Sequence, residues 1–332
     1  MPRTLQVLTV AAVVLLAGAG TALAQSQINL RFASYAPEGD VFDRAATHFA
    51  DGVARRTAGR VKVNVFRNNS LGSNREALEM AKLGSVDFVI AGSTHVSRYA
   101  PVLISASFPY MFKDRQTMFT LLDGNVGKRL NELVARQGFV ILGWWEAGFR
   151  HVSNSVRPIV KPDDIRGLKL RTLPSPVHVA FFRKLGAIPT PMDWAEVMPA
   201  LQQGVIHGQE NPPSVMYPYR VFEFQKYYSL TGHSNDPTLM VASAASLARL
   251  AKEIQDAIRQ SADESTVFER QIADDYNRDI MGKLGQVIKI NEVPEETLVH
   301  FRRTAQTVYQ EAYGDLGADG RAIVDEIVKA SH

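Results

Sequence analysis

The side chains best suited to chemistry in this chain are two arginines, Arg150 and Arg171, and the polar pair Glu210-Asn211 in a predicted turn ahead of two prolines. Arg171 ends an alternating segment, residues 168–171, that predicts a β-strand. Ligands bind beyond the carboxyl ends of the strands in open parallel sheets, so this arginine is well placed to meet one. A guanidinium donates two parallel hydrogen bonds to a carboxylate, which favours an organic acid as the ligand.

Motifs of catalysis are absent from the sequence. The chain has no G-x-S-x-G elbow, no P-loop and no H-E-x-x-H motif, and it has no cysteine for thiol catalysis. Its eight histidines are dispersed, without metal-ligand spacing. We therefore expect a binding protein with no catalytic residue, no metal and no cofactor. A secreted α/β lyase or hydrolase is the alternative, which consumption of the ligand on incubation would reveal.

The elements that must position these residues alternate along the chain. Apolar periodicity predicts strands at residues 28–32, 61–65, 88–91, 139–142, 168–171 and 240–243, with helices at 41–53, 74–83, 177–185 and 193–201. Strands that alternate with helices are typical of a parallel sheet covered by helices. The predicted fold class is therefore α/β.

One segment near the C-terminus is helical over an unusual length. From Ser246 to about Lys283 the periodicity continues without a proline, which predicts a single helix. A helix of about 35 residues spans roughly 50 Å, more than one small domain, so we expect it to brace two. No flexible linker separates the halves, which indicates domains interwoven by several crossings.

The first 24 residues predict a secretory signal peptide. A positive charge at Arg3 precedes the apolar run Leu5 to Leu16, and small residues end at Ala24. This run is short for a membrane span, which needs about 20 residues, and no later segment is long and apolar enough. Without cysteine, neither a lipid anchor at the cleavage site nor a disulfide can form. We expect a soluble, monomeric protein of the periplasm.

The charge balance excludes one class of partner. Lysine and arginine total 37 against 34 aspartate and glutamate, and the bases are scattered. Nucleic-acid binding requires a concentrated basic surface, so we do not expect it.

A series of short motifs carries a family resemblance. The motifs are Gly167–Arg171, Leu185–Ala187, Pro189–Met192, Glu196-Val197, Ala200–Gly204 and Gly208–Pro212. In this order they resemble the substrate-binding component of TRAP transporters, tripartite importers driven by an ion gradient. Leu71-Gly72, Gly84–Phe88 and Phe108–Tyr110 extend the resemblance over nearly the whole mature chain.

The resemblance implies a fold and partners. It implies a periplasmic binding protein type II-like fold, with two α/β domains around a cleft, crossing strands and a long bracing helix. The expected domains are residues 25–147 plus 236–275, and residues 148–235 plus 276–332. The implied partners are a small organic acid and the small and large integral membrane subunits of a TRAP transporter.

The resemblance also assigns roles to side chains. Arg171, in the G-x-K-x-R motif, forms the salt bridge with the ligand carboxylate in this family, Arg150 supports it, and Asn211 adds a hydrogen bond. Trp194, the aromatic residue before Glu-Val, lies over the ligand in relatives. The opposite wall is expected to include Tyr35, Ser93 and His95.

Four further candidates are Trp145, Glu146, His233 and Asp236. A core tryptophan and a charge partner for Arg150 explain the first two equally well, and core or loop-ordering roles explain the others. The chain also departs from the family at His207, where an aspartate is usual, which we interpret as a change in turn packing.

Residue content favours one ligand class without settling it. Polar and aromatic neighbours, among them Asn235, favour a hydroxylated acid such as a uronate or an aldonate. A C4-dicarboxylate requires a second cation, for which only His95 or Arg75 is available, and an aromatic acid would stack on Trp194 and Trp145. A secreted protein that serves a sensor or another importer is the alternative to a TRAP component.

Overall fold

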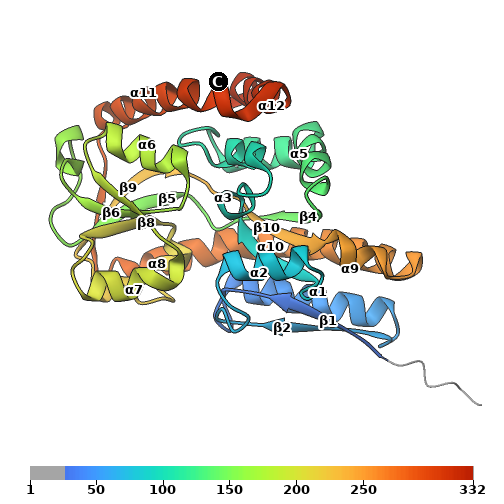
Figure 1. The fold of residues 1–332 in the computed structure, drawn as a ribbon. Coiled ribbons are helices and arrows are strands. Elements are labelled where there is room, and N and C mark those ends of the chain that lie inside the picture. Colours follow the sequence, from blue (N-terminus) through green and yellow to red (C-terminus); the bar gives the residue numbers. More distant parts are fainter. Residues whose placement is uncertain (1–26, 332) are drawn as a thin grey trace, which may run out of the picture.

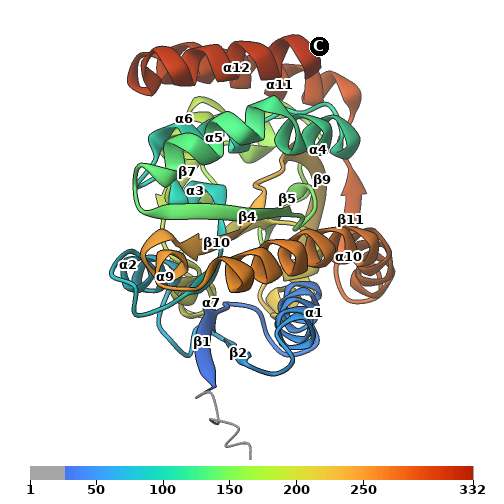
Figure 2. The same cartoon turned by 90° about the vertical axis from the view of Figure 1, so that its right-hand side faces the viewer.

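The computed structural model describes residues 27–331, so the predicted signal peptide lies outside the described residues. Two β-sheets lie side by side and helices cover them (Figures 1 and 2). Within residues 27–331 no helix combines the length and apolar character needed to cross a membrane.

The first sheet contains the N-terminal strands. Its strands are β1 (Ile28–Ala33), β2 (Val61–Phe66), β3 (Phe88–Gly92), β4 (Phe139–Trp145) and β10 (Thr238–Ser243), in the order β2-β1-β3-β10-β4. β1 pairs in parallel with β2 and β3, whereas β10 runs antiparallel between β3 and β4. Apolar and polar residues alternate along β1, so that Leu30 and Phe32 are buried on one face while Arg31 is exposed on the other.

The second sheet contains both candidate arginines. Its order is β11 (Lys289–Glu292), β9 (Tyr227–Ser234), β5 (Arg150–Asn154), β8 (Gly208–Asn211), β6 (Lys169–Thr172) and β7 (Ile188–Pro191). Glu210 and Asn211 therefore lie in a strand, and the predicted turn at this point is wrong. Close approach of β5 explains the glycine that opens β8, since a Cβ on Gly208 would lie 2.1 Å from the Ser153 carbonyl oxygen.

Helices pack around both sheets. They are α1 (Val41–Arg56), α2 (Asn74–Lys82), α3 (Ser93–Val96), α4 (Arg115–Asp123), α5 (Asn125–Ala135), α6 (Pro176–Lys184), α7 (Trp194–Gln202), α8 (Pro213–Met216), α9 (Ala244–Ala248), α10 (Lys252–Leu284), α11 (Glu295–Ala312) and α12 (Gly317–Ser331), with short 3-10 turns such as η1 (Pro101–Ser107) and η4 (Tyr313–Leu316). Side-chain caps fix several starts: Ser73 and Glu76 form a capping box at α2, and Asp193 and Glu196 form the predicted one at α7.

The predicted single helix from Ser246 is wrong at its start. The chain forms the short helix α9, passes through an extended Ala251, and then begins α10 at Lys252. No proline or glycine marks the break; the Arg249 guanidinium, which donates to the Gly84 carbonyl oxygen at 3.1 Å, holds the end of α9 against the turn after α2. The bracing role holds, because α10 packs on α1 and β4 beside the first sheet and on α8 beside the second.

The chain crosses between the sheets repeatedly. It passes from β4 to β5, returns from β9 to β10, and crosses again along α10 to β11 (Figure 1). One apolar core cluster continues across, from Val89 and Leu239 of the first sheet to Val152 and Leu170 of the second. The predicted α/β class is confirmed, but both sheets are mixed, because β10 in the first and β5 in the second run antiparallel to their neighbours, where a parallel sheet was predicted.

Candidate ligand-binding site

A small cavity of about 60 Å³ lies where segments from both sheets meet. Its lining contains seven of the predicted site residues, Tyr35, His95, Arg150, Arg171, Trp194, Asn211 and Asp236, together with Asn74, Gly92, Ala147, Leu173, Val215, Tyr219 and Thr238. Some wall segments belong to the first sheet and others to the second, and the chain crosses between the two sheets. A relative motion of the two sheets would therefore open or close this cavity.

Arg171 is buried beside this cavity without a carboxylate partner among the described residues. It lies in β6, between β7 and β8, and only 1% of its surface is exposed. Its Nε and Nη2 both donate to the Met192 carbonyl oxygen, at 3.0 and 2.8 Å. Burial lowers the pKa of Arg171 to about 10, which still leaves the guanidinium charged at neutral pH.

Two aromatic rings form a corner over this guanidinium. The Arg171 Cζ lies 5.8 Å from the centroid of the Trp194 ring, at the first residue of α7. Tyr219 packs edge-on against Trp194, with ring centroids 5.2 Å apart. The Tyr219 hydroxyl also donates to the Tyr35 carbonyl oxygen at 3.1 Å, a hydrogen bond that joins the two sides of the cavity.

Arg150 differs from Arg171 because its charge is neutralised within the protein. Its Nε lies 2.5 Å from Glu210 Oε2, and its Nη2 lies 3.0 Å from Glu210 Oε1. Both side chains are almost fully buried. Burial opposes ionisation of Glu210, but the charge of Arg150 and a hydrogen bond from His233 hold the pKa of Glu210 well below its usual range.

His233 lies behind this pair and outside the cavity lining. Its Nε2 is 3.1 Å from Glu210 Oε2 and its Nδ1 is 2.8 Å from Thr231 Oγ1. The ring packs against Phe181 and Phe182, and burial lowers the pKa of His233, which favours the neutral imidazole. We expect His233 to position Glu210 rather than to touch a ligand.

Asn211 ends β8 at the edge of the cavity. Its side-chain amide donates to Gln209 Oε1, and its carbonyl oxygen accepts a hydrogen bond from the Tyr228 hydroxyl at 2.9 Å. These bonds, together with pairing of β8 to β5, hold the Asn211 side chain in place at the cavity.

Asp236 organises the opposite wall. It accepts hydrogen bonds from the hydroxyls of Ser93 at 2.6 Å and Thr94 at 3.0 Å, so it caps the first turn of α3. Ser93 is fully buried and lies outside the lining, whereas His95 on the same turn borders the cavity. Nδ1 of His95 is buried without a hydrogen-bond partner among the described residues.

Besides His233 and Ser93, two further predicted residues lie outside the cavity lining. Trp145 is in the core, where its ring stacks on Phe42 and its Nε1 donates to Thr266 Oγ1 at 3.2 Å. Glu146 pairs with Arg115, not with Arg150. These side chains contact residues of the helices α1, α4 and α10, and the neighbouring Ala147 lines the cavity in their place.

The sequence pattern does not show every partner in the site. Glu210 belongs to the Gly208–Pro212 motif, but nothing in its local pattern indicates that it faces Arg150 across two paired strands. Three polar lining residues were not predicted: Tyr219 and Thr238 lie outside the motifs, and Asn74 follows the cap residue Ser73 at the start of α2. The unusual His207 joins strands, because its Nδ1 accepts from the Lys169 backbone N–H at 3.1 Å.

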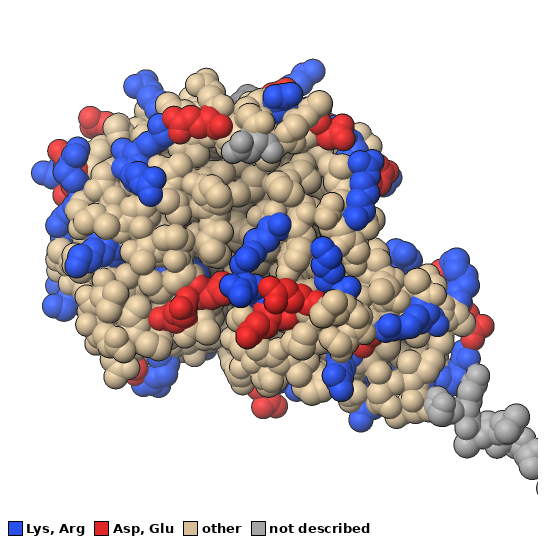
Figure 3. Space-filling view, viewed as in Figure 1, with Lys and Arg blue, Asp and Glu red and all other residues tan. Residues whose placement is uncertain are grey.

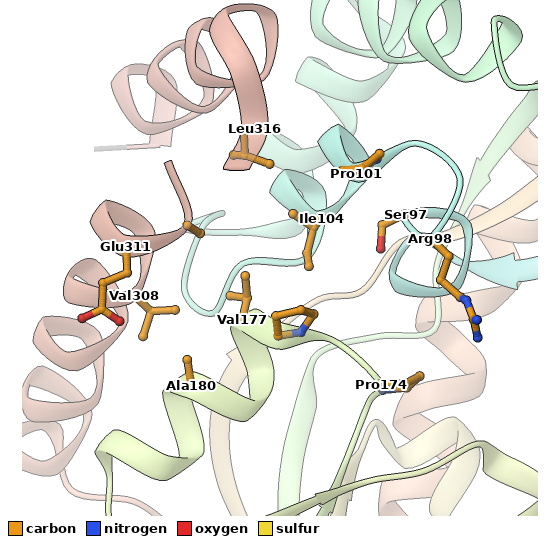
Figure 4. Close-up of a pocket in the computed structure, with 12 residues that line it drawn as sticks. Ser97, Arg98, Pro101, Ile104, Pro174, Val177, Ala180, Val308, Glu311 and Leu316 are labelled. Atoms are coloured by element: carbon orange, nitrogen blue, oxygen red, sulfur yellow. The ribbon is translucent and has the colours of Figure 1, made fainter. Parts of the chain in front are cut away.

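A larger cavity, of about 520 Å³, lies beside α6, η1 and the end of α11. Figure 4 shows Ile104, Val177 and Val308 facing into it, while the guanidinium of Arg98 extends away at its edge. The lining is otherwise largely proline, alanine and leucine. A hydrophilic acid would gain little there, so the smaller polar cavity is the better candidate.

Lysine and arginine lie among aspartate and glutamate on the face in Figure 3, without a large area of one sign. Within residues 27–331 no group of three or more histidine, aspartate or glutamate side chains has the geometry to hold a metal ion.

Comparison with known proteins adds independent findings. The family model described as bacterial extracellular solute-binding protein, family 7, matches residues 32–315. The chain is 35% identical over 255 residues to the 2,3-diketo-L-gulonate-binding periplasmic protein YiaO of Escherichia coli, an alignment that covers 76% of this chain and 78% of that protein.

Two solved structures share the fold. The sugar acid binding protein of Advenella mimigardefordensis, in complex with galactonate, superposes with a TM-score of 0.88 at 28% identity, covering 92% of this chain and 99% of that one. A TRAP periplasmic solute-binding protein of Polaromonas, bound to D-erythronate, gives 0.84 at 30% identity, covering 90% and 98%.

Proposed function

This chain belongs to the bacterial extracellular solute-binding proteins of family 7, the solute-binding components of TRAP transporters, and on that premise we propose that Arg171 anchors the carboxylate of a hydroxylated organic acid inside the cavity. The family resemblance of the motifs is confirmed, and the function that follows is capture of a small organic acid for import. The residues of the site, the ligand and the partners are proposals.

The proposal rests on one observation, that the Arg171 guanidinium is buried without a carboxylate partner among the described residues. A buried charge is stable only when it is paired, and this guanidinium has one carbonyl oxygen as its partner and no carboxylate among the described residues. A ligand carboxylate would provide the missing negative charge. The planar fork would bind it with two hydrogen bonds, strengthened by the exclusion of water.

Arg150 supports the site without competing for the ligand. Glu210 already neutralises it, so one net positive charge faces the cavity from the second sheet. The opposite wall presents a carboxylate at Asp236 and neutral groups at His95 and Thr238. One cation opposite neutral polar groups and a carboxylate favours a hydroxylated monocarboxylate, such as an aldonate or a uronate, over a dicarboxylate.

Binding would proceed by closure of two units, for which we propose the limits 25–147 plus 236–275 and 148–235 plus 276–332. The hydrogen bond from Tyr219 to the Tyr35 carbonyl oxygen joins these units across the cavity and would break on opening. We further propose that the protein acts in the periplasm after removal of residues 1–24. It would deliver the acid unchanged to the two membrane subunits of a TRAP transporter.

The test compares two arginine variants of the refolded, ligand-free protein. A thermal-shift screen of organic acids identifies a ligand, since saturation at 100 times Kd stabilises by about 2.7 kcal/mol. Calorimetric titration then measures its affinity for wild type, Arg171→Ala and Arg98→Ala. Arg98 is exposed and borders the larger apolar cavity, so it is the matched control.

We expect Arg171→Ala to weaken binding by about 3 to 5 kcal/mol, or roughly a hundred- to several-thousand-fold, because the ligand carboxylate would lose its buried partner. Arg98→Ala should leave the affinity unchanged. Loss of binding in the Arg98 variant alone would move the ligand to the larger cavity. Consumption of the acid during incubation would revive the enzyme alternative.

A further inference from the structure

We propose that the cavity selects a compact, acyclic hydroxy acid with one carboxylate and about four or five carbons in its backbone, and that His95 determines this specificity by hydrogen bonding to a ligand hydroxyl. The inference rests on the proposed function and names the ligand class of the same site. Three features of the lining carry it: the space available, the unpartnered imidazole and the distribution of charge.

The space fits a short chain. One water molecule needs about 10–15 Å³ of cavity volume. The cavity of about 60 Å³ therefore holds roughly five groups of the size of a water molecule. A four-carbon trihydroxy acid needs about that room beyond its carboxylate, whereas the ring of a six-carbon uronate needs considerably more. A side chamber of about 10 Å³, which shares Asn74, His95 and Trp194 with the cavity, adds space for one further hydroxyl group.

The aromatic walls set this limit. Tyr219 packs edge-on against Trp194 with centroids 5.2 Å apart, and its hydroxyl is bonded to the Tyr35 carbonyl oxygen. Widening the cavity in the closed state would break that hydrogen bond and separate the two rings. A bulkier ligand would therefore bind more weakly, because the closed state would lose the stabilisation that these two contacts provide.

His95 is the polar group that the protein leaves unsatisfied at this point. The residue is 93% buried, and its Nδ1 has no hydrogen-bond partner among the described residues. Burial lowers the pKa of His95, so the imidazole is neutral at physiological pH, with one nitrogen donating and the other accepting. A hydroxyl can do both and matches either tautomer.

The charges near His95 disfavour a second carboxylate. Asp236 lines the cavity, and Asp193 lines the side chamber. Arg75, the other cation considered for this end, is half exposed and 3.5 Å from Glu79 on the surface of α2. A dicarboxylate would therefore bring its second charge to two carboxylates and a neutral imidazole, without a free cation among the described residues.

The experiment measures affinities of the refolded protein by calorimetric titration. The ligands are D-erythronate and the five-carbon aldonates, D-glucuronate as the larger acid, succinate as the dicarboxylate, and butanoate as the chain without hydroxyls. The variants are His95→Ala, His95→Gln, which keeps a donor and an acceptor, and His300→Ala, an exposed histidine on α11 that serves as the control.

We expect a four- or five-carbon hydroxy acid to bind at least tenfold more tightly than D-glucuronate and succinate. His95→Ala should weaken that acid by about 5- to 100-fold, as expected for leaving a buried hydrogen-bonding group unpaired. Butanoate should bind wild type and His95→Ala equally, and His95→Gln should recover most of the loss.

Two results would overturn this inference. One is D-glucuronate or succinate binding as tightly as the short hydroxy acids; the other is His95→Ala weakening butanoate and the hydroxy acid equally. In either case, an affinity that still depends on Arg171 would leave the proposed function intact. Failure of every carboxylate to bind would instead refute the carboxylate site itself.

Discussion

Glu210→Gln tests whether Arg150 is held by a buried ion pair that stabilises the protein. The substitution keeps the shape of the side chain and removes only the negative charge that faces Arg150 at 2.5 and 3.0 Å. Both side chains are nearly inaccessible to water, so the guanidinium would be left charged and unpaired in the interior. The expected result is a large loss of stability.

The magnitude follows from burial. Removing one partner of a buried pair costs about 3–5 kcal/mol, whereas an exposed pair contributes about 0–1 kcal/mol. Glu223→Gln is the matched control, because Glu223 pairs with Arg220 on the surface. At about 2 °C per kcal/mol for a chain of this size, Glu210→Gln should lower the melting temperature by roughly 6–10 °C and the control by 2 °C or less.

The pH dependence has a definite sign. The pKa of Glu210 is depressed in the folded chain, so its contribution is present above the unfolded value of about 4.3 and is lost only as the pH falls through the folded value. The difference between wild type and Glu210→Gln should therefore persist from pH 8 down to about pH 4.3 and shrink in stronger acid.

Calorimetric melting of the ligand-free proteins provides the assay, with the double variant Arg150→Met/Glu210→Gln as a further test. Removing both charges should cost less than the sum of the two single losses, because neither charge is then orphaned. A stabilising buried pair is refuted if Glu210→Gln melts within 2 °C of wild type, or if the two single effects simply add.

Two further predictions concern the framework. Burial and the nearby Glu146 raise the pKa of Glu269 well above its usual value, so the stability from this site is greatest below about pH 4.3 and is lost as the pH rises toward the raised value. Glu269→Gln should thus raise the melting temperature at pH 8 but not at pH 4, and equal shifts at both would contradict this. Gly208→Ala should destabilise by about 1–3 kcal/mol or more, because its Cβ would lie 2.1 Å from the Ser153 carbonyl oxygen. Gly282→Ala in α10, with no atom within 4 Å, should instead stabilise by about 0.5–1 kcal/mol, and urea unfolding separates the two.

The element order was predictable because most of it follows apolar periodicity. Strand β1 and helix α1 each bury one face, and the pattern shows it directly. Strand β8 was not predictable in this way, because Gly208–Asn211 is polar yet completely buried. Its side chains are stabilised by partners distant in sequence, such as Ser153 and Arg150, rather than by hydrophobicity.

The sequence motifs indicated which residues gather at the candidate site, but not which of their side chains pair with each other. Arg171 at the end of β6 follows from the strand pattern, since parallel strands place their carboxyl ends at one edge. Which arginine is free depends on Glu210, whose direction is set by the register of β8 against β5. Trp145 and Ala147 differ by two positions, and only the three-dimensional arrangement shows which one reaches the cavity.

The two arginines have different roles in this proposal, because Arg150 stabilises the fold and Arg171 provides affinity for the ligand. Arg150 is bonded to Glu210, which His233 also contacts, so Arg150 ties β5 to β8 and holds Asn211 in place. Arg171 does the opposite in the ligand-free protein, because its buried charge is uncompensated.

Arg171→Met should therefore abolish binding while leaving the ligand-free melting temperature equal to or above that of wild type, as expected where function requires a destabilised group. Arg150→Met should lower the melting temperature, because it orphans the Glu210 carboxylate. If Arg171→Met instead lost stability in the absence of ligand as Arg150→Met does, its guanidinium would be a structural element of the core. The carboxylate would then have to be bound elsewhere.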